Sequence, residues 1–154
     1  MLFDVEFQHP FEEDERTYDS ISNNEVIEIF KNIDWAQLNH DVYAKHDDII
    51  HDFYYFSIKY YPTEKLEYTF DIYPIYTYGK DIANTELKFE ITLCKEFLAM
   101  KKVLFGLLGE KEKIDVDITT MEEQNLEFTV KCMYAFISLD FDFLDKNMKD
   151  YYVE

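Results

Sequence analysis

The chain has 154 residues, of which 47% are hydrophobic, and carries a formal net charge of −18. This length is typical of one domain, and three Gly and three Pro provide no flexible linker, so we expect a single domain over residues 1–154. The N-terminal MLFDVEFQHP has neither a basic region nor an apolar run, and no 18-residue apolar stretch could cross a bilayer. These features exclude a signal peptide and a membrane span and predict a soluble, cytoplasmic protein.

The acidic charge is concentrated in the N-terminal third. Residues 1–50 contain thirteen acidic and three basic residues, whereas residues 95–121 contain five of each. Such a field repels nucleic acid and anionic lipid, and it attracts a basic partner by raising the association rate. High acidic charge also keeps proteins soluble, so the charge alone does not establish a partner.

The chain begins with a predicted strand and a loop. Phe3, Val5 and Phe7 alternate with acidic residues, which predicts a short strand with one buried face. The acidic segment FEEDERTYDS, residues 11–20, is expected to form a loop.

Two helices are predicted next. Ser22 and Glu25 have capping-box spacing, and the apolar residues that follow recur at helical intervals, which predicts a helix over 23–33. Asp34 can cap a second helix that extends toward residue 46.

Three strands follow in the aromatic middle of the chain. Large apolar residues occupy alternate positions in 54–60 and again in 66–72, with a PTEK turn between them, which predicts a β-hairpin. A third strand with clean alternation is predicted over 86–93, and Pro62 and Pro74 lie where a strand can spare an amide donor.

The C-terminal part is predicted to mix helix and strand. The apolar spacing of 95–108 favours a helix that ends at Gly109, with a strand as the alternative for its apolar end. Residues 114–119 and 126–138 are predicted to form a second hairpin through an EEQN turn. The segment 141–152 is expected to be a closing helix.

These elements predict an α+β fold. Short turns between strands favour a mainly antiparallel sheet of about five to six strands, with the helices packed on one of its faces. Asp140 or Asp142 can cap the closing helix.

A cluster of histidines and acids is the strongest candidate for a metal site. His40, His46 and His51 are accompanied by four aspartates, and imidazole and carboxylate together suit zinc, manganese or iron. The histidine intervals of six and five residues do not place the rings on one helical face. A solvated loop uses the same residues, so a metal-dependent enzyme is kept only as an alternative. The aspartates are Asp41, Asp47, Asp48 and Asp52.

Other chemistry finds little support in the sequence. Three glycines do not provide a phosphate-binding loop, and no cofactor is expected. Cys94 and Cys132 fit no metal or redox spacing and are expected to be reduced thiols. A single arginine, Arg16, provides no basic groove for nucleic acid. We therefore expect a protein that is not an enzyme.

The thirteen tyrosines exceed what a core of this size requires. Tyrosine is favoured at protein interfaces because its ring gives contact area at low entropic cost and its hydroxyl can form hydrogen bonds. In the predicted hairpin, Phe53, Tyr55 and Tyr61 lie opposite the core positions, and Tyr73 is placed similarly. These rings either lie beneath a helix or form an exposed aromatic patch.

In its style, the whole chain resembles the small acidic immunity proteins that neutralise polymorphic toxins of competing bacteria. The similar features are an early helix carrying IEIFKNIDW, aromatic hairpins, a short α+β domain and strong acidity. The resemblance implies a monomer or weak homodimer that binds a cognate toxin, often a basic nuclease, and blocks its active or substrate-binding surface. An acidic DNA mimic that inhibits a nucleic-acid-binding enzyme is a second alternative.

Acidic side chains are expected to pair with basic groups on the toxin, while aromatic side chains fill pockets. The expected partner-binding residues combine both types. They are Glu12, Glu13, Asp14, Glu15, Trp35, Asp47, Asp48, Tyr55, Tyr61, Glu67, Asp71, Tyr73, Tyr76 and Tyr78.

Overall fold

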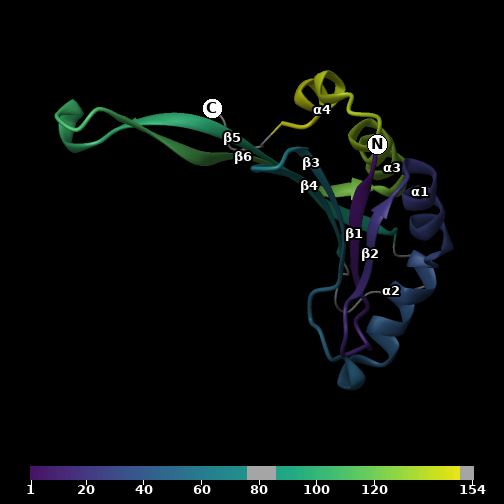
Figure 1. Cartoon of the computed structure of the whole chain (residues 1–154). Helices are drawn as coiled ribbons and strands as arrows, with labels where there is room; N and C mark the ends of the chain where they lie inside the picture. Colours follow the sequence, from purple (N-terminus) through teal and green to yellow (C-terminus); the bar gives the residue numbers. More distant parts are fainter. Residues whose placement is uncertain (76–85, 150–154) are drawn as a thin grey trace.

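A computed structural model, which describes residues 1–75 and 86–149, shows one six-stranded antiparallel sheet with the strand order β2-β1-β3-β4-β5-β6. Four α-helices lie on one face of this sheet (Figure 1). The α+β prediction is confirmed. The strands are β1 (Phe3–Gln8), β2 (Arg16–Ile21), β3 (Tyr55–Thr63), β4 (Leu66–Ile75), β5 (Lys88–Lys102) and β6 (Glu110–Asn125). The helices are α1 (Asn23–Asn32), α2 (Trp35–Ala44), α3 (Leu126–Ile137) and α4 (Phe141–Asn147), with 3-10 turns η1 (His46–Asp48) and η3 (Leu104–Gly106).

The N-terminal helices begin where their capping residues predict. Both halves of the capping box form before α1: the Ser22 hydroxyl accepts from the Glu25 amide, and the Glu25 carboxylate accepts from the Ser22 amide. The Asp34 carboxylate accepts from the Gln37 amide at the start of α2. Together with β1 and the β3–β4 hairpin, these helices confirm the predictions for this half of the chain.

The predicted loop over 11–20 is wrong in its second half, which forms β2. This strand pairs with β1 at the edge of the sheet, and its side chains are exposed or only half-buried. Only Tyr18 and Ile21 of this edge strand pack against the core, so it shows no alternation of apolar and polar residues that would reveal it in the sequence.

Two predictions in the C-terminal half are also wrong. The helix predicted over 95–108 is not formed: residues 95–102 continue β5, which pairs with β6 from Lys88↔Asn125 to Lys102↔Glu110, and Leu104–Gly106 form η3. Residues predicted as a strand over 126–138 form α3, whose Asn125 side chain accepts from the Phe128 amide at 2.8 Å. The strand predicted over 114–119 is confirmed as part of β6.

The closing helix is shorter than predicted. Asp140 caps α4 by accepting from the Phe143 amide, and the helix ends at Asn147. The last residues of the predicted range, 150–152, lie outside the described residues.

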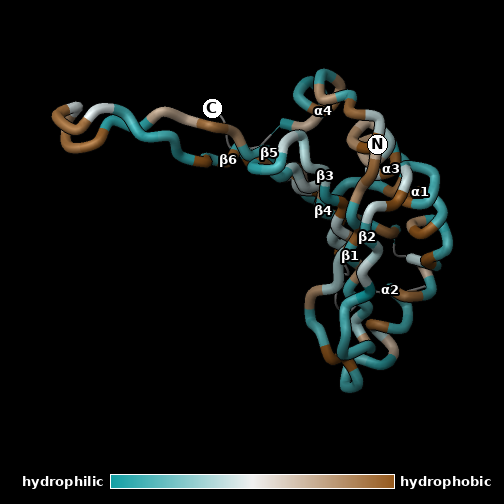
Figure 2. The backbone as a smooth tube through the Cα atoms, viewed as in Figure 1, coloured by the Kyte–Doolittle hydropathy of each residue, from teal (hydrophilic) through white to brown (hydrophobic). Residues whose placement is uncertain are grey.

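The far halves of β5 and β6 form a two-stranded arm that leaves the body of the protein (Figure 1). We define the arm as residues 95–117. It projects on the side of the sheet that carries no helix, and its far end is hydrophobic (Figure 2). The turn at this end is η3.

An aromatic core joins the sheet to the helices. Phe56 of β3 is fully buried and lies 5.2 Å from Phe30 of α1, 6.4 Å from Trp35 of α2 and 6.4 Å from Phe7 of β1, measured between ring centroids. Edge-to-face packing at such distances adds to the free energy gained from burying the rings. Phe56 therefore links β3 to β1, α1 and α2.

Replacing Phe56 by Ala should lower the free energy of unfolding by about 3–5 kcal/mol, because the mutation removes a buried ring and leaves a cavity. Urea unfolding followed by circular dichroism measures this change. Phe53→Ala is the matched control, since Phe53 is 82% exposed. Equal effects of the two substitutions would contradict the assignment of Phe56 to the core.

Candidate functional site: the open face of the sheet

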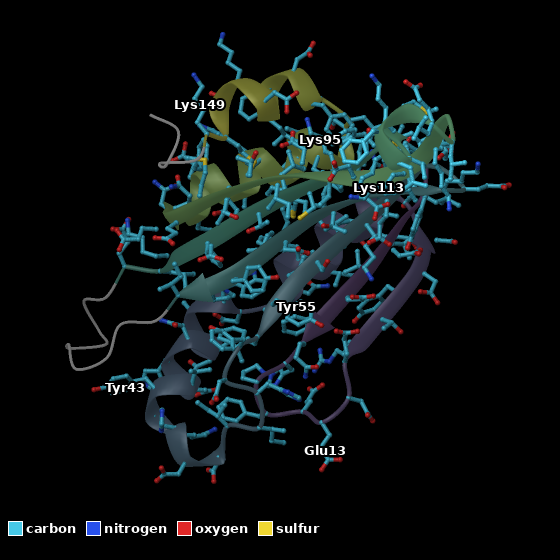
Figure 3. All side chains as sticks on the ribbon, turned by 90° about the vertical axis from the view of Figure 1, so that its left-hand side faces the viewer. Glu13, Tyr43, Tyr55, Lys95, Lys113 and Lys149 are labelled. Carbon is cyan, nitrogen blue, oxygen red and sulfur yellow. The ribbon has the colours of Figure 1, made fainter. Side chains whose placement is uncertain are left out.

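The face of the sheet opposite the helices is uncovered over the described residues, and Figure 3 looks onto it with Tyr55 near its middle. Because side chains alternate along a strand, each buried core residue places its neighbour on this open face. Cross-strand partners point to the same side, so the register aligns these neighbours in rows. The residues on this open face include Asp4, Glu6, Tyr55, Ser57, Lys59, Tyr61, Glu67, Thr69, Asp71, Tyr73, Glu90, Thr92, Cys94 and Glu96.

Two tyrosines occupy the middle of the open face. The rings of Tyr55 and Tyr73 lie 6.1 Å apart between centroids, and the Tyr55 hydroxyl donates a hydrogen bond to the Glu15 carboxylate. Burial and the neighbouring Glu15 carboxylate raise the pKa of Tyr55, while burial and the Asp71 carboxylate raise the pKa of Tyr73 to about 12. Both hydroxyls therefore remain protonated hydrogen-bond donors.

A polar row crosses the face beside these rings. Lys59 forms an ion pair with Glu6, and the Ser57 hydroxyl donates a hydrogen bond to Asp71. Burial raises the pKa of the Asp71 carboxyl, an effect that the Ser57 hydrogen bond and Lys59 partly offset. The row thus holds a carboxylate whose charge is disfavoured by its surroundings.

Near the arm, the face presents Tyr61, which is 47% exposed, beside Glu67. Burial of the hydroxyl raises the pKa of Tyr61, and the carboxylates of Glu67 and Asp4 raise it further. The Glu67 amide donates to the Glu96 carboxylate at 2.7 Å. An exposed ring is thus surrounded by negative charge.

The two acidic segments of the N-terminal third meet at the end of the sheet away from the arm. The Pro10 carbonyl accepts hydrogen bonds from the Ile50 amide at 2.9 Å and the His51 amide at 3.1 Å. The His51 Nε2 lies 3.2 Å from the Glu13 carbonyl oxygen. These contacts bring the loop of Glu12, Glu13, Asp14 and Glu15 close to the segment of Asp47 and Asp48.

The remaining expected site residues are placed differently. Trp35, expected at the partner surface, instead lies in the core with 5% of its surface exposed, because it packs against Phe7, Phe30 and Phe89. Tyr76 and Tyr78 lie outside the described residues. The structure therefore brings Tyr55, Tyr61, Glu67, Asp71 and Tyr73 together on one face and removes Trp35 from it.

Several open-face residues were not predicted as site residues, although the alternation of residues along their strands indicated where they lie. Asp4 and Glu6 alternate with the core residues of β1, and Glu90 and Glu96 belong to the same alternation in β5. The period of two indicated their side of each strand. The order in which the strands pair, which places them near Tyr61 and Asp71, was not available from the sequence.

Within residues 1–75 and 86–149, no three His, Cys, Asp or Glu side chains are grouped closely enough to hold a metal ion. The His40 Nδ1 lies 3.7 Å from an Asp41 carboxylate oxygen on the exterior of α2, while His51 contacts the Glu13 backbone.

The two cysteines are free and lie on different faces of the sheet. Cys132 of α3 is buried in the core, and burial raises the pKa of its thiol to about 12. Cys94 is half-buried on the open face, and burial also raises its pKa. A raised pKa reduces the fraction of reactive thiolate, so neither thiol is activated as a nucleophile.

Comparisons with known proteins found no matching family model, no similar curated protein and no similar solved structure. Among the described residues, no helix has the length and apolar character needed to cross a membrane.

The raised pKa of Asp71 leads to a pH-dependent prediction. The folded protein holds this proton more tightly than the unfolded chain, so the stability that the neutral carboxyl provides is lost as the pH rises from about 3.8 through the raised value. Asp71→Asn keeps a neutral group that can accept from Ser57. The variant should therefore gain stability relative to the wild type as the pH rises toward 7.

Urea unfolding of both proteins between pH 4 and pH 7 tests this prediction. Glu64→Gln removes one negative charge at an exposed turn position and serves as the control. A difference between Asp71→Asn and the wild type that does not change with pH would contradict the role of burial.

Proposed function

We propose that this chain is a non-enzymatic binding protein that neutralises a cognate basic bacterial toxin by covering its active or substrate-binding surface. The observation that carries this proposal is the open face of the sheet, which combines the exposed Tyr61 and the half-buried Tyr55 and Tyr73 with an excess of carboxylates. Surfaces of this kind, uncovered on a single domain, are typical of protein recognition.

The charge of the open face favours a basic partner. Six carboxylates occupy strand positions on it, whereas the described basic side chains at such positions are Lys59 and Lys88, which pair with Glu6 and Glu86. The acidic loop of 12–15 extends the same charge toward the far end of the face. The carboxylates on the face are Asp4, Glu6, Glu67, Asp71, Glu90 and Glu96.

The tyrosines add aromatic contact area, which charged side chains alone do not provide. The rings of Tyr55 and Tyr73 pack against each other, and the Tyr55 hydroxyl is bonded to Glu15, so these rings lose little conformational freedom when a partner binds. Tyr61 is more exposed and sits beside Glu67. In this mechanism Tyr61 and Tyr73 fill pockets on the toxin, and the surrounding acids pair with its basic residues.

An acidic mimic of DNA is the second candidate, because carboxylates at alternate positions of neighbouring strands form rows on one face. On this face, however, the rows are interrupted by the Lys59–Glu6 ion pair and by the rings of Tyr55 and Tyr73. A target that fits rings as well as charges, namely a protein surface, is therefore favoured. If the target is a DNA-binding enzyme, DNA and this chain compete for the same site on it, so binding that DNA does not displace excludes the DNA mimic.

The partner is sought first in the product of the neighbouring upstream gene, by pull-down with the purified chain. Absence of a toxin-like neighbour together with absence of binding would refute the proposal. Once a partner has been captured, two variants of this chain test how it is bound.

Replacing Tyr61 and Tyr73 together by Ala should raise the dissociation rate of the complex by about tenfold or more, because buried aromatic anchors dominate interface energies. Surface plasmon resonance measures the rate. Tyr43→Ala is the matched control, since Tyr43 is an exposed tyrosine on α2, in the helical layer. An effect of Tyr43→Ala equal to that of the double variant would place the interface elsewhere.

Replacing Glu12, Glu13 and Asp14 by Gln, Gln and Asn should instead slow association and weaken its dependence on salt, while the dissociation rate changes little. The same binding experiment at several sodium chloride concentrations provides both rates. Glu28→Gln, an exposed change on α1, is the control for loss of charge. A triple variant with unchanged association kinetics would show that this loop does not steer the partner.

A further inference from the structure

The proposed function leaves the far end of the arm unexplained. Leu104, Phe105, Leu107 and Leu108 each expose at least 60% of their surface, and Phe105 is fully exposed. Clustered apolar side chains of this size are rare on the surface of an isolated protein and mark a site of contact. We refer to residues 104–108 as the tip.

The backbone of the tip supports a binding role. Leu104 and Phe105 adopt left-handed conformations, with φ of 49° and 56°, which are unfavourable for bulky residues and would suit Gly or Asn. The Gly106 amide donates to the Val103 carbonyl at 3.1 Å, and the Val103 amide donates to the Gly109 carbonyl at 3.1 Å. A turn that keeps large apolar residues at a conformational cost indicates a use for those side chains.

The helical layer of the same chain contains an apolar groove of about 890 Å³ between α3 and α4. Its apolar lining includes Leu126, Val130, Tyr134 and Phe143. Carboxylates of Glu127 and Asp140 also line this groove, as does Lys131, which is already paired with Glu127. The Lys31 ammonium also lies 6.0 Å from the centroid of the Tyr134 ring, so the groove combines an apolar floor with charges of both signs at its rim.

The tip and the groove of one molecule do not meet. The arm projects from the open side of the sheet, whereas α3 and α4 belong to the helical layer on the other side (Figure 1). The tip therefore cannot fill the groove of its own molecule.

The charge distribution makes a second copy the fitting occupant. Residues 100–113, which contain the tip, have four lysines and two glutamates and a net charge of +2, whereas the remaining 140 residues carry −20. A basic apolar knob is thus attracted to an acidic body with an apolar groove. An anionic bilayer fits less well, because it would accept the tip but leave the groove without an occupant.

We infer that the tip of one copy docks into the α3–α4 groove of a second copy, with Phe105 and its leucine neighbours on the apolar floor and the flanking lysines beside Glu127 and Asp140. Repulsion between the two acidic bodies is weak in this arrangement. The strand from Lys95 to Lys102 holds the tip roughly 23 Å from the sheet, well beyond the screening length of about 8 Å at physiological salt. The inference does not rest on the proposed toxin binding, because the tip and the groove both lie outside the open face.

Sedimentation velocity of the purified chain over a range of concentrations tests the inference. The wild type should associate, and Phe105→Asn should weaken association by about tenfold or more, because it removes the most exposed ring of the tip. Asn favours the left-handed backbone at this position, so the melting temperature of the variant should not fall. Phe53→Asn, the same change at another exposed phenylalanine, is the matched control and should associate as the wild type does.

The groove is tested by Leu126→Asp, at the first residue of α3, where an acidic residue is compatible with the helix N-terminus. This variant should also be monomeric. A mixture of Phe105→Asn and Leu126→Asp should recover heterodimers, because one copy keeps an intact groove and the other an intact tip. Val130→Asp provides a second groove variant if Leu126→Asp unfolds.

Three results would overturn the inference. The first is a wild type that remains monomeric at every concentration. The second is association that is lost in the tip variant but kept in both groove variants. The third is flotation of the monomeric wild type with vesicles of phosphatidylcholine and phosphatidylglycerol that is lost in Phe105→Asn, which would assign the tip to a membrane.

Discussion

The hydrophobic core of the described chain is built on one face of the sheet. The large apolar residues of β1, β3, β4 and β5 point to the side covered by the helices, where Phe56 and Phe136 contact rings from several elements. Because strands alternate, each of these core residues forces its neighbours onto the opposite side. The open face therefore contributes little to the hydrophobic core, and its composition is free to serve another purpose.

Some residues of the open face do not increase the stability of the fold. Asp71 sits where burial disfavours its charge, and the carboxylates of Glu67 and Asp4 raise the pKa of Tyr61. A face selected only for folding would carry Thr, Val or alternating charges at such positions. Under the proposed function, these acids and rings serve recognition, and the core on the other side offsets their energetic cost.

The sequence predicted most reliably those elements that have one buried and one exposed face. The helix capped by Ser22 and the hairpin around Pro62 were predicted because one wet and one dry face impose a clear period. The arm has no covered face, so KEFLAMKK, rich in helix-forming residues, contains no alternation, and pairing with β6 decides its conformation. In α3, Thr129, Cys132, Met133, Phe136 and Ile137 form a helical stripe, but β-branched and aromatic residues in the same segment favoured a strand.

The site was predictable to a similar extent. The alternation of side chains along each strand predicted that Tyr55, Tyr61, Glu67, Asp71 and Tyr73 lie on the side away from the core. The surplus of aromatic residues did not reveal that Trp35 is buried.

In the arm, strand pairing occurs without core packing, although the two are coupled in most folds. Its residues belong to the sheet through their backbone hydrogen bonds, yet none of their side chains enters the core, which ends near Leu93. Removing or adding residues in matched pairs, two on each strand, would preserve which side chains face each way. The reach of the tip could therefore lengthen or shorten among related chains while the body stays unchanged, so a difference in length within 95–117 would signal a change in geometry of contact and not a change of fold.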